Sequence, residues 1–242
     1  MSRPPKTAHK SKSKSGLAIK THTNLTRDAY NEIRRLIFLN ELRTGQKVAY
    51  REMAQRLGMS LTPVVQALKH MEFMGLLQHE PNRGFYIKPI VPQEVSEAYD
   101  LRELLESQMI PKIIVRLDED GKRRIKGALE EYIQAGHTGS LKLRLAKDMN
   151  FHMTLAEISK QSITIWMLRY LLDFLYLRFE KEMIFSRPQE SSAAEHRRIY
   201  DCVAERNPRA ARKAMRDHIR SVKDNVMEDL RNRLSETEEI EI

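Results

Sequence analysis

The apolar residues of this 242-residue chain recur mostly three and four positions apart, which is the spacing of one face of a helix. Such stripes predict helices from residue 24 or 26 to about 42, over 50–57, and from 61 to about 74. Residues 76–90 differ, because apolar and polar positions alternate there as in a β-hairpin. The tip of that hairpin is expected at Pro81, Asn82, Arg83 and Gly84.

Beyond the linker marked by Pro89 and Pro92, every apolar stripe is again helical. Pro111 should kink or split the first of these helices near Ser107, since proline removes a helical hydrogen bond. Ser140, Ser162 and Asn207 are expected to begin later helices as N-caps. The predicted helices span 94–116, 118–135, 140–159, 162–185, 191–206 and 208–234, with a break at 186–190 around Pro188.

Residues 48–77 have the pattern of a helix-turn-helix. A turn at Gly58 and Met59 separates two short amphipathic helices, and Ser60 stands where the N-cap of the second helix belongs. That second helix would enter a DNA major groove. The residues predicted to face inward are Met53, Ala54, Leu57, Val64, Ala67, Leu68 and Met71. The fold class is therefore mostly α, with an N-terminal winged helix-turn-helix and a C-terminal antiparallel all-α bundle.

Charge is divided unevenly along the chain. Residues 1–92 hold 16 lysines and arginines against 6 acidic residues, whereas residues 93–242 hold 26 against 27. A basic helix-turn-helix half is what phosphate neutralisation on double-stranded DNA requires. The expected domains are a disordered basic tail (1–24), the winged helix-turn-helix (25–91), an all-α domain (92–235) and a fraying acidic tail (236–242).

The remaining composition narrows the class of protein. A single cysteine, Cys202, excludes a disulfide framework and suits a reducing compartment. No apolar run approaches the length of a membrane span, so we expect no membrane partner. The N-terminus has no apolar signal-peptide core. A cytoplasmic location is expected.

Two pairs of ionisable residues fall on inward helix faces. Asp148 and His152, four residues apart, lie on the same stripe of the helix that begins at Ser140. His196 and His218 lie equally far before and after Asn207, so an antiparallel hairpin would set them side by side. Any one of these histidines alone would be read as a hydrogen-bonded core residue. Together they suit a divalent metal, with Zn²⁺ first and Ni²⁺ or Mn²⁺ as alternatives.

Arg102 lies one turn after Tyr99 on the first helix of the bundle. An arginine beside a metal could bind a small carboxylate through two parallel hydrogen bonds, with Tyr99 nearby. The alternative is a surface ion pair with Glu106, four residues further along the helix.

Several motifs resemble the GntR family of transcriptional regulators, in its FadR subfamily with an FCD effector-binding domain. These are R-E-M-A-Q-R-L-G-M-S-L-T-P-V-V-Q-A-L (51–68), G-L-L (75–77), R-G-F-Y-I (83–87), L-R-E-L-L-E (101–106), D-M-N-F-H (148–152), E-H-R-R-I (195–199) and D-H-I (217–219). The resemblance implies a homodimer formed through the helical domain. It also implies a metal at Asp148, His152, His196 and His218, with an organic acid effector near Arg102.

The recognition helix departs from that family pattern. Leu61 and Val65 replace two arginines that usually contact guanines or phosphates, so we expect an unusual operator. Pro111 is a second departure, in a helix that the family normally keeps whole. The residues expected at the DNA interface are Arg51, Ser60, Leu61, Thr62, Pro63, Val65, Gln66, Lys69, Arg83 and Gly84.

The expected function is a ligand-responsive DNA-binding regulator, with repression as the default sign. Two alternatives remain open at this point. One is a FadR-like regulator that binds acyl-CoA without a metal. The other is a metal-dependent hydrolase, against which we find no further carboxylate placed as a general base.

Overall fold

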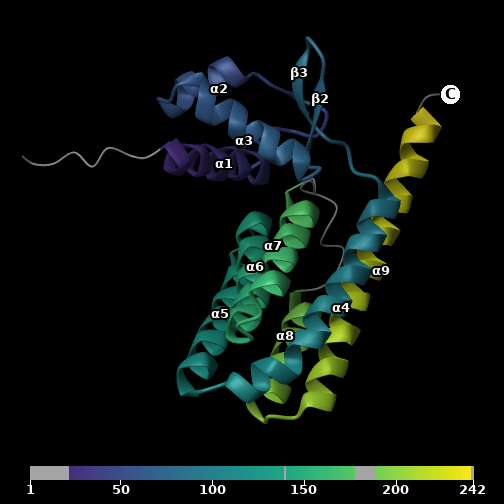
Figure 1. Ribbon diagram of the computed structural model, residues 1–242. Helices are drawn as coiled ribbons and strands as arrows, with labels where there is room; N and C mark the ends of the chain where they lie inside the picture. The colour runs from purple at the N-terminus through teal and green to yellow at the C-terminus, as the bar shows by residue number, and fades with distance from the viewer. Residues whose placement is uncertain (1–21, 139, 178–188, 241–242) are drawn as a thin grey trace, which may run out of the picture.

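The computed structural model describes residues 22–138, 140–177 and 189–240 (Figure 1). Its N-terminal part is a small helical domain with a wing. Helix α1 begins at His22 and includes residues 22–24, which the sequence placed in a disordered tail; residues 1–21 lie outside the description. The elements of this domain are α1 (His22–Phe38), β1 (Lys47–Val48), α2 (Tyr50–Leu57), α3 (Leu61–Phe73), β2 (Leu77–Glu80) and β3 (Gly84–Ile87).

The three strands form an antiparallel sheet in the order β1-β3-β2. Strands β2 and β3 are the predicted hairpin, with Glu80 opposite Gly84 at its tip. Strand β1 was not predicted, because two residues are too few for an alternation to be visible. It pairs Val48 with Phe85, and both side chains are buried in the core of the domain.

The helix-turn-helix has the predicted turns. Gly58 ends α2 in the left-handed region at φ 60°, and Gly75 follows α3 at φ 69°, where a side chain would be strained. Ser60 occupies the N-cap position of α3, as expected, but its hydroxyl makes no capping hydrogen bond. Of the predicted inward residues, all are buried except Leu57, which is half-buried.

The second part of the chain is a bundle of six helices within the described residues. Figure 1 shows α4 and α9 side by side on one flank, while α5, α6 and α7 form the other. The helices are α4 (Pro92–Arg116), α5 (Glu119–His137), α6 (Leu141–Ile158), α7 (Ser162–Tyr176), α8 (Gln189–Ala204) and α9 (Pro208–Ile240). The predicted fold class is thereby confirmed.

Pro111 does not split α4, which runs without interruption from Pro92 to Arg116. A proline inside a helix costs about 3 kcal/mol. On either side of it, Ile110, Ile113 and Ile114 are buried in the bundle core, and each such side chain contributes about 1.5–3 kcal/mol. Packing therefore holds together a helix that local propensity would break.

Helix ends agree with the sequence in part. Ser140 caps α6, since its hydroxyl accepts from the Leu143 amide at 3.3 Å. Ser162 is instead the first residue of α7, whose N-cap is Gln161. The structure ends α7 at Tyr176, and the predicted extension to residue 185 and the break at 186–190 fall largely on residues 178–188, outside the description.

Helix α9 continues to Ile240 and so includes residues 236–240, where the sequence led us to expect a fraying acidic tail. This segment consists mainly of glutamates, which are good helix formers, and no glycine or proline interrupts it. Asn207 caps the start of the helix as predicted, accepting from the Ala210 amide at 3.1 Å.

Each part has its own apolar core. One lies among α1–α3 and the sheet, and the other fills the bundle. Within the described ranges, no helix is both long enough and apolar enough to cross a bilayer.

Candidate metal centre and DNA-binding surface

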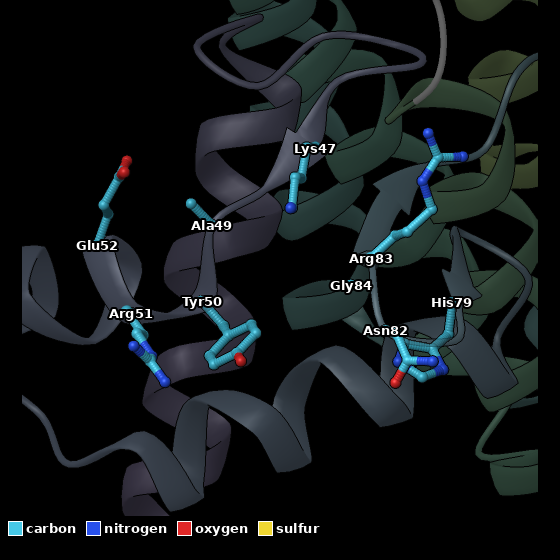
Figure 2. Close-up of a pocket in the computed structure, with 9 residues that line it drawn as sticks. All are labelled: Lys47, Ala49, Tyr50, Arg51, Glu52, His79, Asn82, Arg83 and Gly84. Carbon is cyan, nitrogen blue, oxygen red and sulfur yellow. The ribbon is translucent and has the colours of Figure 1, made fainter.

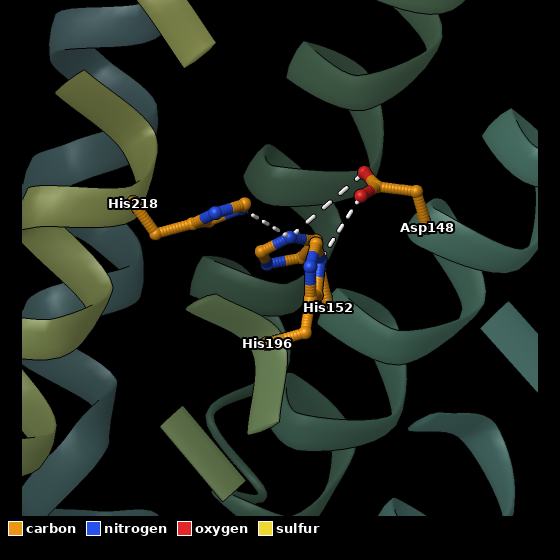
Figure 3. A group of neighbouring side chains, drawn as sticks. All are labelled: Asp148, His152, His196 and His218. Carbon is orange, nitrogen blue, oxygen red and sulfur yellow. Dashed lines mark hydrogen bonds and ion pairs between the residues drawn. The ribbon is translucent and has the colours of Figure 1, made fainter. Parts of the chain in front are cut away.

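Four ligating side chains converge inside the bundle (Figure 3). Asp148 and His152 come from α6, His196 from α8 and His218 from α9. His196 Nε2 lies 3.0 Å from Asp148 Oδ1, and the Nε2 atoms of His152 and His218 are 3.3 Å apart. One ligating atom of each residue lies within 4.8 Å of those of the other three. The cluster expected from the sequence is therefore present.

The hairpin of α8 and α9 explains how two of these residues meet. Asn207 lies midway between His196 and His218 in the sequence, and the chain reverses there. The two imidazole rings meet edge to face, with an interplanar angle of 65° and centroids 4.4 Å apart. Equal distance from the turn thus brings them to the same level, as predicted.

Each imidazole is fixed through its Nδ1 atom. Glu106 Oε2 lies 2.5 Å from Nδ1 of His152, the Ser192 carbonyl oxygen 2.8 Å from Nδ1 of His196, and Glu195 Oε2 2.9 Å from Nδ1 of His218. An acceptor at Nδ1 places the proton there and leaves Nε2 as a lone-pair donor. All three Nε2 atoms consequently point at the cluster centre in the form that a metal binds.

Sequence reasoning missed these orienting residues as part of the site. Glu106 lies on α4, and its contact with α6 is a packing outcome that no spacing in the sequence reveals. Glu195 carried a usable signal, because it directly precedes His196 and stands 23 positions from His218 across the same hairpin. It went unused because adjacent residues on a helix point in different directions.

The electrostatics of the centre favour ligand protonation states. Burial, together with the neighbouring His196, lowers the pKa of His218 from 6.5 to about 3. Burial also lowers the pKa of His152, although Glu106 opposes this shift. Burial raises the pKa of the Asp148 carboxyl, but its interactions with His196, His152 and Arg102 outweigh that effect and hold it well below its usual value. Two neutral imidazoles beside an ionised carboxylate need lose no proton before they bind a metal.

The donor set fits a tetrahedral divalent ion. Two nitrogens bound to the same tetrahedral Zn²⁺ at about 2.0–2.1 Å stand about 3.3 Å apart. The Nε2 atoms of His152 and His218 have that separation, 3.3 Å. One carboxylate with three imidazoles is also a common ligand class for Zn²⁺. The residues present therefore fit the group, while its identity stays a proposal.

Arg102 is buried beside this cluster, with 1% of its surface exposed. Its Nε donates to Glu106 Oε1 at 2.6 Å and its Nη1 to Tyr176 Oη at 2.9 Å. Arg102 thus does pair with Glu106, as the alternative expected, but the pair is buried and not on the surface. Within the described residues, Arg102 Nη2 and the Tyr99 hydroxyl are buried without a hydrogen bond, and Nη2 lies 4.0 Å from Asp148 Oδ2.

The expected DNA-contacting side chains lie on the winged domain. Most are exposed, namely Arg51, Ser60, Leu61, Thr62, Gln66, Lys69 and Arg83, whereas Val65 and Gly84 are half-buried. Pro63 is buried, so its side chain is not exposed to DNA in this structure. It serves the first turn of α3, where a missing amide proton costs nothing.

A hollow of about 390 Å³ opens between the start of α2 and the tip of the wing. Figure 2 shows Tyr50 and Arg51 on one side of it and His79, Asn82 and Arg83 on the other, with Lys47 between them. The wing and the start of α2 thus present cationic side chains on one face. Exposed guanidinium and ammonium groups in such a place are suited to phosphate oxygens.

A winged helix-turn-helix with this cationic surface, joined to a helical domain with a buried ligating cluster, defines a DNA-binding transcriptional regulator. The sequence profile "Bacterial regulatory proteins, gntR family" matches residues 25–87, and that of the FCD domain matches residues 97–221. The chain belongs to the GntR family and carries an FCD domain. It is a regulator and not an enzyme, so the hydrolase alternative is excluded.

Similar proteins agree with this class. The chain is 26% identical over 191 residues to the uncharacterised HTH-type regulator YdhC of Bacillus subtilis, covering 78% of this chain and 85% of that one. It is 23% identical over 218 residues to the Glc operon transcriptional activator of Escherichia coli, covering 80% and 85%. The structure of E. coli McbR/YncC superposes with a TM-score of 0.73 at 18% identity, covering 81% and 94%, and supports the fold.

Proposed function

We propose that a homodimer of this chain binds a palindromic operator in double-stranded DNA and represses transcription, and that a small carboxylate at a divalent metal in the bundle changes its affinity for DNA. The observation that supports this proposal is the buried ligating cluster inside the helical bundle. Its three imidazoles are already oriented through Nδ1. A structural core has no need for three converging lone pairs.

For DNA, we propose that α3 lies in the major groove and the wing reaches the adjacent backbone or minor groove. Thr62, Gln66 and Lys69 are exposed on α3, and Arg83 at the wing tip has 75% of its side chain exposed. Leu61, 45% exposed, offers only apolar contact, for which a thymine methyl group is the natural partner. The operator is therefore expected to contain thymine where relatives with arginine read guanine.

For the metal, Zn²⁺ is the first choice, with Ni²⁺ and Mn²⁺ as the alternatives. When bound, the ion would supply a positive centre that a carboxylate ligand can reach. Asp148, His152, His196 and His218 would hold it.

For the effector, Arg102 Nη2 and the Tyr99 hydroxyl supply buried donors with no acceptor among the described residues. A carboxylate at the metal would accept from both and remove the cost of leaving them unpaired. This favours a small acid over an acyl-CoA. If the purified protein holds substoichiometric metal, and His152→Ala does not change that amount, the result would instead indicate an acyl-CoA regulator without a metal.

For the dimer, we propose a second copy of the chain against α7. Ile163, Trp166 and Met167 occupy one face of this helix, with 74%, 61% and 39% of their surfaces exposed. Apolar side chains at this spacing and exposure mark an interface more often than a solvated face. Light scattering should give twice the 28.4 kDa mass of the chain, and Trp166→Glu should shift it towards the monomer.

Repression is proposed as the sign, because a bound dimer can block transcription without any further contact, whereas activation needs one with polymerase. The test is fluorescence anisotropy with DNA from upstream of the chain's own coding region, for protein stripped of metal, loaded with Zn²⁺, and loaded with Zn²⁺ plus citrate as a probe acid. Sequence-specific binding that citrate changes only in the zinc form supports the proposal. Binding that ignores sequence and disappears at modest salt contradicts it.

A further inference from the structure

The last turn of α7 contacts both domains at once. Tyr176 faces the ligating cluster, while the next residue, Leu177, is buried in the apolar core of the winged domain. Asp173, one turn before Tyr176, is 4% exposed and faces α1 of that domain. Figure 1 shows α7 reaching from the bundle to the underside of α1 and α3.

The Tyr176 hydroxyl forms hydrogen bonds directly with residues of the site. Its hydroxyl donates to Asp148 Oδ2 at 2.6 Å and accepts from Arg102 Nη1 at 2.9 Å. Asp148 is one of the four candidate ligands, and Arg102 is the proposed effector arginine. Any change in what these two residues bind therefore changes the partners of the Tyr176 hydroxyl.

The Asp173 carboxylate forms hydrogen bonds directly with the DNA-binding domain. Its Oδ1 accepts from Arg34 Nε on α1 at 2.8 Å and also from Arg34 Nη2. Burial and the Asp173 charge raise the pKa of Tyr30, one turn before Arg34, to about 12. The carboxylate thus acts on two residues of α1.

In the described part of the chain, few other contacts join the two domains. All the extensively packed pairs of elements lie within one domain or the other. A cavity of about 500 Å³ separates α1 from α6, with Arg34 and Phe38 on one wall and Met149 and Met153 on the other. The orientation of the winged domain consequently depends on few contacts, and those at the end of α7 are buried.

We propose that Asp173 and Arg34 are a positioning pair that couples the occupancy of the ligating cluster to the DNA-binding domain, with Tyr176 as the group on the same helical turn that senses the cluster. This rests on the proposed function. Tyr176 and Asp173 lie on one rigid turn, so a displacement of the tyrosine hydroxyl moves the carboxylate that holds α1. A coupling of this kind acts equally in both directions.

The test uses Zn²⁺ alone as the probe and hydrogen exchange of the α1 amides, residues 25–38, as the readout. Asp173→Asn removes the charge that holds Arg34, and Arg34→Gln removes its partner. Glu131→Gln is the matched control, because Glu131 pairs with Lys147 between two helices of the bundle and does not reach the winged domain. Isothermal titration with Zn²⁺ on each variant shows that the site is still filled.

In wild type and Glu131→Gln, saturation with Zn²⁺ is expected to change α1 exchange about fivefold, the lower end of the usual coupling range. Asp173→Asn, Arg34→Gln and their double mutant should bind one Zn²⁺ and show the same reduced response, within about twofold of none. An undiminished α1 response in zinc-saturated Asp173→Asn overturns the coupling.

Two outcomes separate this inference from the proposed function. A zinc-saturated wild type whose α1 exchange does not change overturns the coupling and leaves the metal site standing. A wild type that binds no Zn²⁺ overturns the metal site and the coupling with it.

Discussion

Glu106 Oε2 lies 2.5 Å from His152 Nδ1, while the other oxygen of the same carboxylate accepts from Arg102 at 2.6 Å. One buried side chain thus joins a candidate metal ligand to the candidate effector-binding arginine. Burial raises the pKa of Glu106, but its interactions with His152 and Arg102 outweigh that and lower it to about 2. The carboxylate is therefore ionised at neutral pH and orients both partners.

Replacing Glu106 should weaken metal binding without removing a ligand. In Glu106→Gln one of the two oxygens that accept from His152 and Arg102 becomes an amide NH₂, which cannot accept, so the Zn²⁺ affinity should fall about 10- to 100-fold. Competition with a chelating dye measures it. Glu103→Gln on the same helix breaks an exposed pair with Arg220 and should leave affinity unchanged. Equal affinity for Glu106→Gln and wild type would show that His152 needs no orienting carboxylate.

Acid should destabilise the metal-free protein at an unusually mild pH. His218 has a pKa of about 3 in the folded chain against 6.5 as its model value, so the unfolded state binds more protons as the pH falls below 6.5. Its contribution to stability is complete above pH 6.5 and is lost progressively towards the folded pKa. Linkage gives a loss of about 2 kcal/mol between pH 6.5 and 5 from this group alone.

Urea unfolding of stripped protein at those two pH values measures this loss. Saturating Zn²⁺ should reduce the slope, because a bound imidazole resists protonation. In His218→Gln the slope should also fall, since the group that titrates is gone. A flat stability between pH 6.5 and 5 in stripped wild type would contradict a buried neutral imidazole at this position.

The wing arginine should contribute a sequence-independent part of DNA affinity. Arg83 is exposed at the hairpin tip. Within the described residues, Glu80 is its one ion-pair partner. Arg83→Ala should lower the slope of log K against log salt by about 0.9 if it neutralises one phosphate. Arg123→Ala, at an exposed position of α5, is the control and should leave the slope as it is. If both variants give the same slope of log K against log salt, Arg83 does not lie at the DNA interface.

Restoring the family arginines should change which operator is preferred. Leu61→Arg places a bidentate donor at an exposed position of α3, where guanine should gain about 1–3 kcal/mol over the other bases. Selection from a randomised DNA library, for wild type and variant, shows the preference at each position. If both proteins select the same sequence, Leu61 does not face the bases.

The main features of fold and site could be predicted because they depend on short-range rules. Asp148 and His152 share a helix face by spacing, and His196 and His218 meet by symmetry about Asn207, which caps the next helix. Turns at glycines of positive φ are equally local. Such rules need no knowledge of how distant helices pack.

The features that could not be predicted depend on tertiary packing. Glu106 and Tyr176 reach the cluster from α4 and α7, at crossings that no local spacing encodes. Pro111 stays within a helix because both halves of α4 are held in the core, and the burial of Pro63 could not be inferred from its motif. Conversely, the length of α9 was available from helix propensity, which the acidic composition of the tail obscured.

Anomalous diffraction from crystals of untagged protein, purified without chelator, tests the central claim most directly. Data collected on both sides of the zinc, nickel and manganese edges identify any ion at the cluster. We predict one anomalous peak within about 2.0–2.2 Å of a ligating atom from each of Asp148, His152, His196 and His218, with density for a bound acid towards Arg102. Four well-ordered side chains around a position with no anomalous signal, even after soaking with Zn²⁺, would contradict it.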